Sequence, residues 1–323
     1  MKRTGRIITG LIIAGIGVIV LTWFLTSTST ISEPQKKRQF VTVVVSDSTD
    51  SRWVRFRAGL EKAADDYDVS LNYAVTGKFE SPQEQMHLIS GAASASDGLI
   101  VQLEESEESE ESVRDIARTT VLELIDISET FSASEEGSYA GIGTDSRAIG
   151  ESLAETVKND MAESEVPAEL KIGIISGNQR LAVSRERLSA LTEALEVFGI
   201  TPVWIAESAE SVESYVNVNT VIALDNTNLE QAGDILRTDE EPRIRLYGIG
   251  CSDKTIYYLD RGLIAAMIVP DDFRMGYLAM TEVHNRLNTP NIPMKDRQVS
   301  FEVITKDNLY SKKHESTLFP IIN

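Results

Sequence analysis

From residue 40 onward, short β-branched runs alternate with segments of helical periodicity, and this alternation limits the chain to α/β folds. The first run, Phe40–Ser46, reads FVTVVVS, as expected for a parallel strand buried on both faces. The next segment, Ser51–Tyr67, spaces its apolar residues as an amphipathic helix does. Further strands are expected at Ser70–Val75, Gly98–Gln102, Val121–Asp126, Ser138–Gly143, Lys171–Ser176, Pro202–Ala206, Thr220–Leu224, Arg245–Gly250, Leu263–Val269 and Ser300–Thr305. Helices are expected at Pro82–Ser94, 145–160, Ser184–Phe198, Leu229–Arg237, Ser252–Asp260 and Phe273–Leu287.

These units fall into two successive series, which predicts an α/β fold of two doubly wound lobes with parallel sheets. The length of 323 residues agrees with two domains at roughly 150 residues per domain.

The N-terminal segment Ile7–Leu25 contains no charged residue and is long enough to span a bilayer as one helix. A signal-peptide core is shorter, so we expect a retained transmembrane anchor. The alternative is a long signal peptide that is cut within residues 26–32. The polar residues 26–39 then form a linker between the anchor and the lobes.

Residues 1–6 carry three positive charges, from Lys2, Arg3 and Arg6, and are expected in the cytoplasm. The lobes are therefore expected on the extracellular or periplasmic side of the cell membrane. Lys36, Lys37 and Arg38 on the far side of the apolar segment weaken this orientation.

The charge and the motif content exclude several kinds of function. The net charge is −19, which argues against nucleic-acid binding. Cys251 is the single cysteine, so no disulfide within the chain and no cysteine zinc site are expected. No P-loop, Gly-x-Ser-x-Gly or His-Glu-x-x-His motif occurs. We expect no catalytic residues, metal or cofactor; the competing enzyme hypothesis would be revealed by metal- or nucleotide-dependent turnover.

An acidic run follows the third expected strand, with glutamates at positions 104, 105, 107, 108, 110 and 111. A run of this kind can form a metal or partner site. The prediction we favour is a solvated loop and helix start, where carboxylates suit the positive end of the helix dipole.

Five segments, taken in order, resemble the type I periplasmic-binding-protein superfamily, close to its ribose-type sugar-binding members. They are Val43–Leu71, Asp97–Gln102, Tyr139–Glu155, Ser184–Leu195 and Gly248–Ala279, the last of which contains a Met-Gly-x-x-Ala helix. The resemblance covers about residues 40–311 and implies two lobes joined by a hinge. It implies that residues 40–138 and 271–297 form the first lobe and that residues 139–270 and 298–323 form the second. It also implies a ligand cleft between the lobes, at the carboxyl ends of the parallel strands.

By this resemblance, the first lobe contributes Asp50, Arg52 and Trp53 from the loop after the first strand. Asp50 is expected to contact a ligand hydroxyl, and Trp53 to stack on a sugar ring unless it packs in the core instead. Asp126 is expected at the cleft edge of the fourth strand. The family often has an arginine directly after this aspartate, but Ile127 occupies that position here.

From the second lobe, the resemblance implies Arg185 as the polar clamp, with a surface ion pair as the alternative, and Asp225 as a hydroxyl ligand. Arg187 matches the family's next arginine, and Asn226 or Asn228 is expected to cap the following helix.

Two expected polar contacts are missing, because Gly250 and Pro270 stand where the family has polar residues. Their absence implies an unusual ligand, weak affinity or lost binding.

The resemblance implies a membrane-anchored substrate-binding protein that captures a sugar or similar polar small molecule by hinge closure. The expected partner is the permease of an ABC transporter. The alternative is a sensor subunit that presents its closed state to a membrane histidine kinase.

Overall fold

The structure, a computed structural model, describes residues 38–46, 50–74, 77–105, 109–127, 139–162, 170–212, 215, 217–237 and 244–318. Residues Gln39–Asn323 form one compact unit. The predicted transmembrane segment 7–25 and nearly all of the predicted linker lie outside the described residues. Within the described ranges, no helix combines the length and the apolar character needed to cross a membrane.

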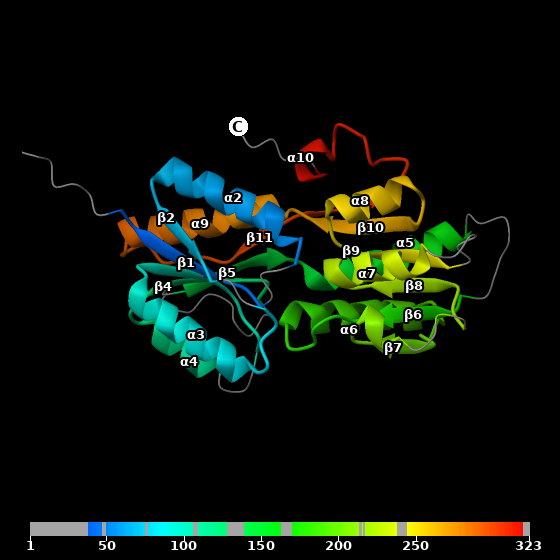
Figure 1. Cartoon of the computed structure of the whole chain (residues 1–323), viewed down its shortest axis with the longest axis horizontal. Helices are drawn as coiled ribbons and strands as arrows, with labels where there is room; N and C mark the ends of the chain where they lie inside the picture. Colours follow the sequence, from blue (N-terminus) through cyan, green and yellow to red (C-terminus); the bar gives the residue numbers. More distant parts are fainter. Residues whose placement is uncertain are drawn as a thin grey trace, which may run out of the picture. The chain divides into compact units, whose positions relative to one another are not determined.

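The first lobe is built on a parallel sheet with the order β11-β5-β4-β3-β1-β2 among the described residues. Its strands are β1 (Phe40–Val44), β2 (Ser70–Tyr73), β3 (Gly98–Gln102), β4 (Val121–Ile125), β5 (Tyr139–Thr144) and β11 (Arg297–Val299). Helices α2 (Trp53–Tyr67) and α9 (Asp272–Asn288) cover one face, and α3 (Pro82–Ala95) and α4 (Ser109–Ala117) cover the other (Figure 1).

The second lobe is built on a sheet with the order β12-β10-β9-β8-β6-β7. Its strands are β6 (Ile172–Ile175), β7 (Trp204–Ala206), β8 (Thr220–Ala223), β9 (Arg245–Ile249), β10 (Ile264–Pro270) and β12 (Phe301–Thr305). Only β12 is antiparallel to its described neighbour. Helices α5 (Ser146–Ala162) and α6 (Ala182–Val197) cover one face, and α7 (Asn226–Leu236) and α8 (Asp253–Asp260) cover the other. The short helices η2 (Ala209–Ser211) and α10 (Glu315–Leu318) complete the described elements of this lobe.

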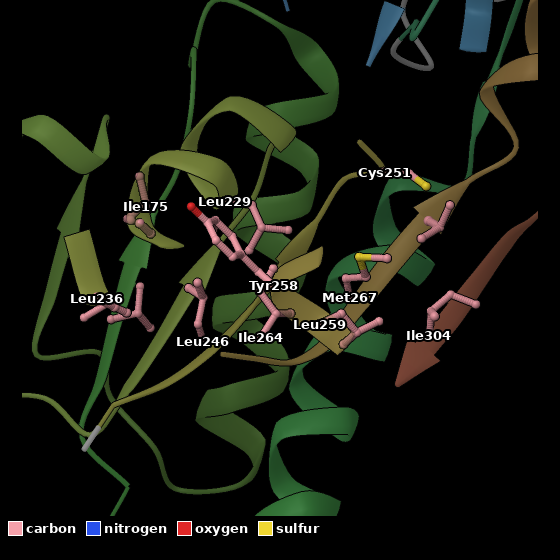
Figure 2. Packing of buried hydrophobic residues seen from close by; sticks show 14 of the residues in the cluster. Ile175, Leu229, Leu236, Leu246, Cys251, Tyr258, Leu259, Ile264, Met267 and Ile304 are labelled. Carbon is pink, nitrogen blue, oxygen red and sulfur yellow. The ribbon is translucent and has the colours of Figure 1, made fainter. Parts of the chain in front are cut away.

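Each sheet has apolar side chains on both faces, as parallel strands covered by helices require. In the second lobe, Leu229 and Tyr258 of the covering helices pack with Leu246 and Met267 of the strands (Figure 2). Cys251 is part of this core with 1% exposure, so the thiol packs as a small apolar side chain.

Helices α2 and α9 pack very closely in the first lobe. A Cβ atom at Gly59 would lie 1.9 Å from the carbonyl oxygen of Phe273, and one at Gly276 would lie 2.1 Å from that of Phe56. The glycine in the Met-Gly-x-x-Ala motif therefore permits direct contact between the two helix backbones.

The prediction of an α/β fold with two parallel-sheet lobes is confirmed, but the lobe boundaries differ from those expected. Strand β5 pairs with β4 in the first lobe, so the boundary expected at residue 139 moves to the end of β5. Strand β11 pairs with β5, which moves the second boundary from residue 297 to Val299. The chain consequently crosses between the lobes near Asp145, Asp271 and Ser300.

Candidate ligand-binding cleft

The lobes enclose a cavity of about 350 Å³ at the carboxyl ends of their parallel strands. The first lobe lines it with Ser46, Asp50, Arg52, Trp53, Lys78 and Gln102. The second lobe lines it from the segments that follow β6, β7 and β8, and from the first turns of α6 and α7. This is the position at which a doubly wound fold binds ligands.

Arg52 lines the cavity and pairs with two buried aspartates. Its Nη1 lies 2.9 Å from Asp126 Oδ2, and its Nη2 donates to Asp272 Oδ1 at 3.2 Å. Burial alone would raise the pKa of Asp126, but the positive charges of Arg52 and Arg187 and the hydrogen bonds from Arg52 and Gln102 lower it. Burial raises the pKa of Asp272 to about 6 against the attraction of Arg52.

Arg52 pairs with Asp126, although Ile127 stands directly after this aspartate where the family often has an arginine. Asp126 ends β4 in the left-handed conformation, with φ of 55°, which aspartate tolerates better than most residues. Its carboxylate, 5% exposed as a residue, is held by Arg52 and by Gln102 Nε2 at 2.9 Å. Asp126 therefore lies behind the cavity wall and is not among the residues that line the cavity.

Trp53 lines the cavity but is only 5% exposed. Its ring meets Phe56 edge-on at 5.3 Å, and the guanidinium carbon of Arg52 lies 4.4 Å from the ring centroid. The expected stacking face is therefore covered by Arg52, and the burial of Trp53 agrees with the alternative of a core residue.

Of the two arginines in α6, the structure brings Arg187 to the cavity and not Arg185. The Arg185 guanidinium pairs with Glu105 and donates to the carbonyl oxygens of Gln179 and Arg180, at 3.0 and 3.1 Å. Arg187 lines the cavity, is 3% exposed, and its Nε has no hydrogen-bond partner. Burial lowers the pKa of Arg187, with nearby Asp126 acting in the opposite direction.

A periodicity in the sequence distinguishes the two arginines. Arg187 lies four residues after buried Val183 and three and four residues before buried Ala190 and Leu191, so it shares the inward stripe of α6. Arg185 lies about 200° away around the helix. The ion pair of Arg185 with Glu105 agrees with the alternative expected for Arg185, and helical phase places Arg187 on the inward face instead.

Asp225 lines the cavity and is also the N-cap of α7. Its two carboxylate oxygens accept hydrogen bonds from the backbone N–H and the side-chain amide of Asn228, at 2.8 and 2.7 Å. Burial raises its pKa against these bonds. The expectation that Asn226 or Asn228 caps this helix is therefore wrong, and Asp225 is only partly available to a ligand.

Gly250 has a structural reason to lack a side chain. A Cβ atom there would come within 2.6 Å of Asn226 Oδ1, and the residue has φ of +153°. Asn226 uses this room to reach the other lobe, where its Nδ2 donates to Asp50 Oδ1 at 3.0 Å and to Ser51 Oγ at 2.7 Å. The missing side chain at Gly250 thus leaves room for a contact between the lobes.

A second set of contacts joins the lobes at the acidic run. Glu104 is 1% exposed, accepts from Asn178 Nδ2 at 2.9 Å, and lies 3.1 Å from Arg180 Nε. The Arg180 guanidinium also donates to the carbonyl oxygens of Phe79 and Glu80, at 2.6 and 2.9 Å. The prediction of a solvated loop is therefore wrong for Glu104, because an arginine of the second lobe compensates its burial.

A family model described as a periplasmic binding protein domain matches residues 41–289. No curated protein sequence matches the chain. Among solved structures, the chain is similar to a carbohydrate transporter solute binding protein from Agrobacterium radiobacter in complex with D-arabinose. The TM-score is 0.75 at 18% identity, over 88% of this chain and 99% of that chain.

Two further solved structures have the same fold. GanP, a glucose-galactose binding protein from Geobacillus stearothermophilus, matches with a TM-score of 0.72 at 22% identity, over 85% of this chain and 100% of that chain. The XylFII-LytSN complex matches with a TM-score of 0.71 at 17% identity, over 84% of this chain and 98% of that chain.

Proposed function

The chain belongs to the family of periplasmic binding protein domains, and we propose from this premise that it captures a sugar or a similar polar small molecule between its lobes. The protein is a binding module and not an enzyme. Its lobes close around the ligand by rotation at the three chain crossings, and the closed shape is what a partner recognises.

The observation that carries this proposal is Arg187. A buried guanidinium whose Nε lacks a hydrogen-bond partner costs free energy, which hydrogen bonds from its other N–H groups to a ligand in the cavity offset. The planar fork of arginine matches two neighbouring oxygens, such as the vicinal hydroxyls of a sugar. Arg187 comes from the second lobe and faces a cavity that the first lobe also lines, so a ligand held by it bridges both lobes.

The surrounding groups support a ligand rich in hydroxyls. The cavity wall contains carboxylates, amides and hydroxyls from both lobes, including Asp50, Asn178 and Ser184. Hydroxyl groups both donate and accept hydrogen bonds, so one sugar satisfies such a mixed set. Two similar structures, a D-arabinose complex and a glucose-galactose binding protein, are consistent with this class of ligand.

The test is thermal unfolding of the purified full-length chain against a panel of pentoses, hexoses, polyols and small acids. The detergent must lack a sugar headgroup. A ligand at about 100 times its Kd adds ~2.7 kcal/mol of stability. We expect a clear shift with at least one sugar. A folded protein whose unfolding temperature no sugar raises would contradict the proposal.

For the partner, we propose the permease of an ABC transporter, with residues 7–25 as a transmembrane anchor that keeps the lobes beside it on the outer face of the membrane. The charge-free length of this segment and the basic residues before it support the anchor and its orientation.

The second candidate is a sensor subunit for a membrane histidine kinase. The similar protein XylFII occurs in a complex with LytSN, and a transmembrane helix can contact partner helices in a way that a lipid anchor cannot. Co-purification of the chain with each membrane protein encoded beside its gene separates the two candidates. Ligand-dependent association with a permease supports the first, and association with a kinase supports the second.

A further inference from the structure

The cavity extends well beyond Arg187 toward the edge of the second sheet. Its lining includes Asp225 after β8, Asn178 after β6 and Glu207 after β7. These three strands are consecutive neighbours in the sheet, and β7 is the edge strand. At about 4.8 Å between strands, the row from β8 to β7 spans roughly 10 Å.

Helix α7 gives the extent of the cavity in a second direction, along the helix axis. Thr227 and Gln231 both line the cavity, and they lie one turn apart on α7. With a rise of 1.5 Å per residue, these two positions lie about 6 Å apart, so the cavity follows α7 over at least that length. A single sugar ring held by Arg187 therefore leaves the outer part of the cavity unfilled.

The outer part offers polar groups suited to hydroxyls. Gln231 Nε2 donates to Glu210 Oε1 at 3.3 Å, which fixes an amide and a carboxylate side by side. The carboxylate of Glu207 and the ammonium of Lys78 make no hydrogen bond or ion pair with other residues in the described part of the chain. Lys78 comes from the first lobe, so both lobes contribute to this end as well.

Resting on the proposed function, we propose that the ligand is longer than one sugar ring, namely a disaccharide or a glycoside with a polar second unit. The first unit lies against Arg187. The second unit lies between Lys78 of the first lobe and Glu207, Glu210 and Gln231 of the second lobe.

The test compares dissociation constants within matched pairs on the full-length chain, measured by calorimetry. The pairs are D-glucose with cellobiose and maltose, D-galactose with 1,4-galactobiose, and D-xylose with xylobiose. We expect one disaccharide to bind at least ~10-fold more tightly than its monosaccharide, because the outer groups add hydrogen bonds. Monosaccharides that bind as tightly as every disaccharide would overturn this inference while leaving the proposed function intact. Failure of all sugars to bind would overturn both.

The variant Gln231→Ala tests the position of the second unit. We expect the ratio of the two dissociation constants to fall toward 1, with little change in unfolding temperature because alanine suits a helix. Gln298→Ala is the matched control, since Gln298 is exposed in β11 and does not line the cavity. An unchanged ratio in Gln231→Ala would show that the second unit does not reach this end.

Discussion

Arg185 and Arg187 are separated by one residue of α6 but have opposite surroundings. The side chain of Arg185 is 44% exposed and pairs with Glu105 in the other lobe, whereas Arg187 is 3% exposed as a residue and faces the cavity. Because burial disfavours its charged form, Arg187 lowers the stability of the folded protein unless a ligand compensates it.

The substitution Arg187→Met keeps the apolar stem and removes the buried charge. We expect the ligand-free variant to gain about 1–3 kcal/mol of unfolding free energy, because an unsatisfied charged group is removed. The same change should weaken sugar binding roughly 10- to 100-fold. Urea unfolding and calorimetry measure the two effects. The comparison variant Arg185→Met should show neither the gain in unfolding free energy nor a comparable loss of sugar affinity. Equal changes in both variants would contradict the assignment of Arg187 to the ligand.

Glu123 in β4 is a second buried ionisable residue. It is 0% exposed, and both its carboxylate oxygens lack a hydrogen-bond partner. Burial, followed by repulsion from Glu282 and Asp296, raises its pKa well above the usual value, with Arg297 acting in the opposite direction. The folded protein therefore holds a proton that the unfolded chain releases near pH 4.

This proton makes stability depend on pH. Because the pKa of Glu123 is raised by folding, its contribution is fully present below about pH 4 and is lost as the pH rises toward the folded-state pKa. In the variant Glu123→Gln the side chain at this position cannot ionise. The difference in unfolding free energy between the variant and the natural protein should therefore increase in favour of the variant, by up to ~1.4 kcal/mol per pH unit across that window. Urea unfolding between pH 4 and 8 measures the difference, with Glu155→Gln, an exposed residue of α5, as the control. A constant difference across this range would refute the argument.

At the scale of elements, the close contact between α2 and α9 depends on the glycines at positions 59 and 276. The variant Gly276→Ala places a methyl group against the carbonyl oxygen of Phe56 and should cost about 1–3 kcal/mol of stability. Gly91→Ala is the matched control, because Gly91 lies in α3 and a methyl group added there would meet no atom within 4 Å. It should instead gain about 0.5–1 kcal/mol from helix propensity. Thermal unfolding separates the two, and a neutral Gly276→Ala would contradict the close packing.

Periodicity predicted most elements of both lobes, because a buried parallel strand and an amphipathic helix each have a strong local pattern. Strand β11 was not predicted, since Arg297 and Gln298 are exposed and give no apolar run. The boundary at residue 139 was misplaced because a strand's sheet depends on its partner, here β4, and not on its own residues.

The candidate site was predicted only in part, because some of its contacts join residues that lie far apart in the sequence. Asp50, Arg52, Trp53 and Asp225 were expected at the cleft and line the cavity. The pairing of Arg52 with Asp126 and Asp272 joins residues up to 220 positions apart, and no local pattern encodes it. The burial of Glu104 depends in the same way on Arg180 from the other lobe.

At the scale of the whole molecule, direct contacts join the lobes on both sides of the cavity. Asn226 of the second lobe binds Asp50 and Ser51 on one side, and Arg180 binds Glu104 and the 79–80 carbonyls on the other. These contacts exist only when the lobes are close, so they favour the closed arrangement independently of any ligand contact.

The variant Arg180→Ala should therefore shift the protein toward an open arrangement. We expect a larger radius of gyration in small-angle X-ray scattering, because the Glu104 pair and both carbonyl contacts are lost. Arg118→Ala is the control, since Arg118 pairs with Asp115 of its own lobe. An unchanged radius of gyration in Arg180→Ala would show that these contacts do not hold the lobes together.

The most direct test of the central claim is calorimetric titration of the sugar that most raises the unfolding temperature, into the natural protein and into Arg187→Met under identical conditions. We expect saturable binding at one site per chain, weakened roughly 10- to 100-fold in the variant while its fold is at least as stable. Equal affinity in both proteins would place the ligand away from Arg187 and contradict the account of the cleft.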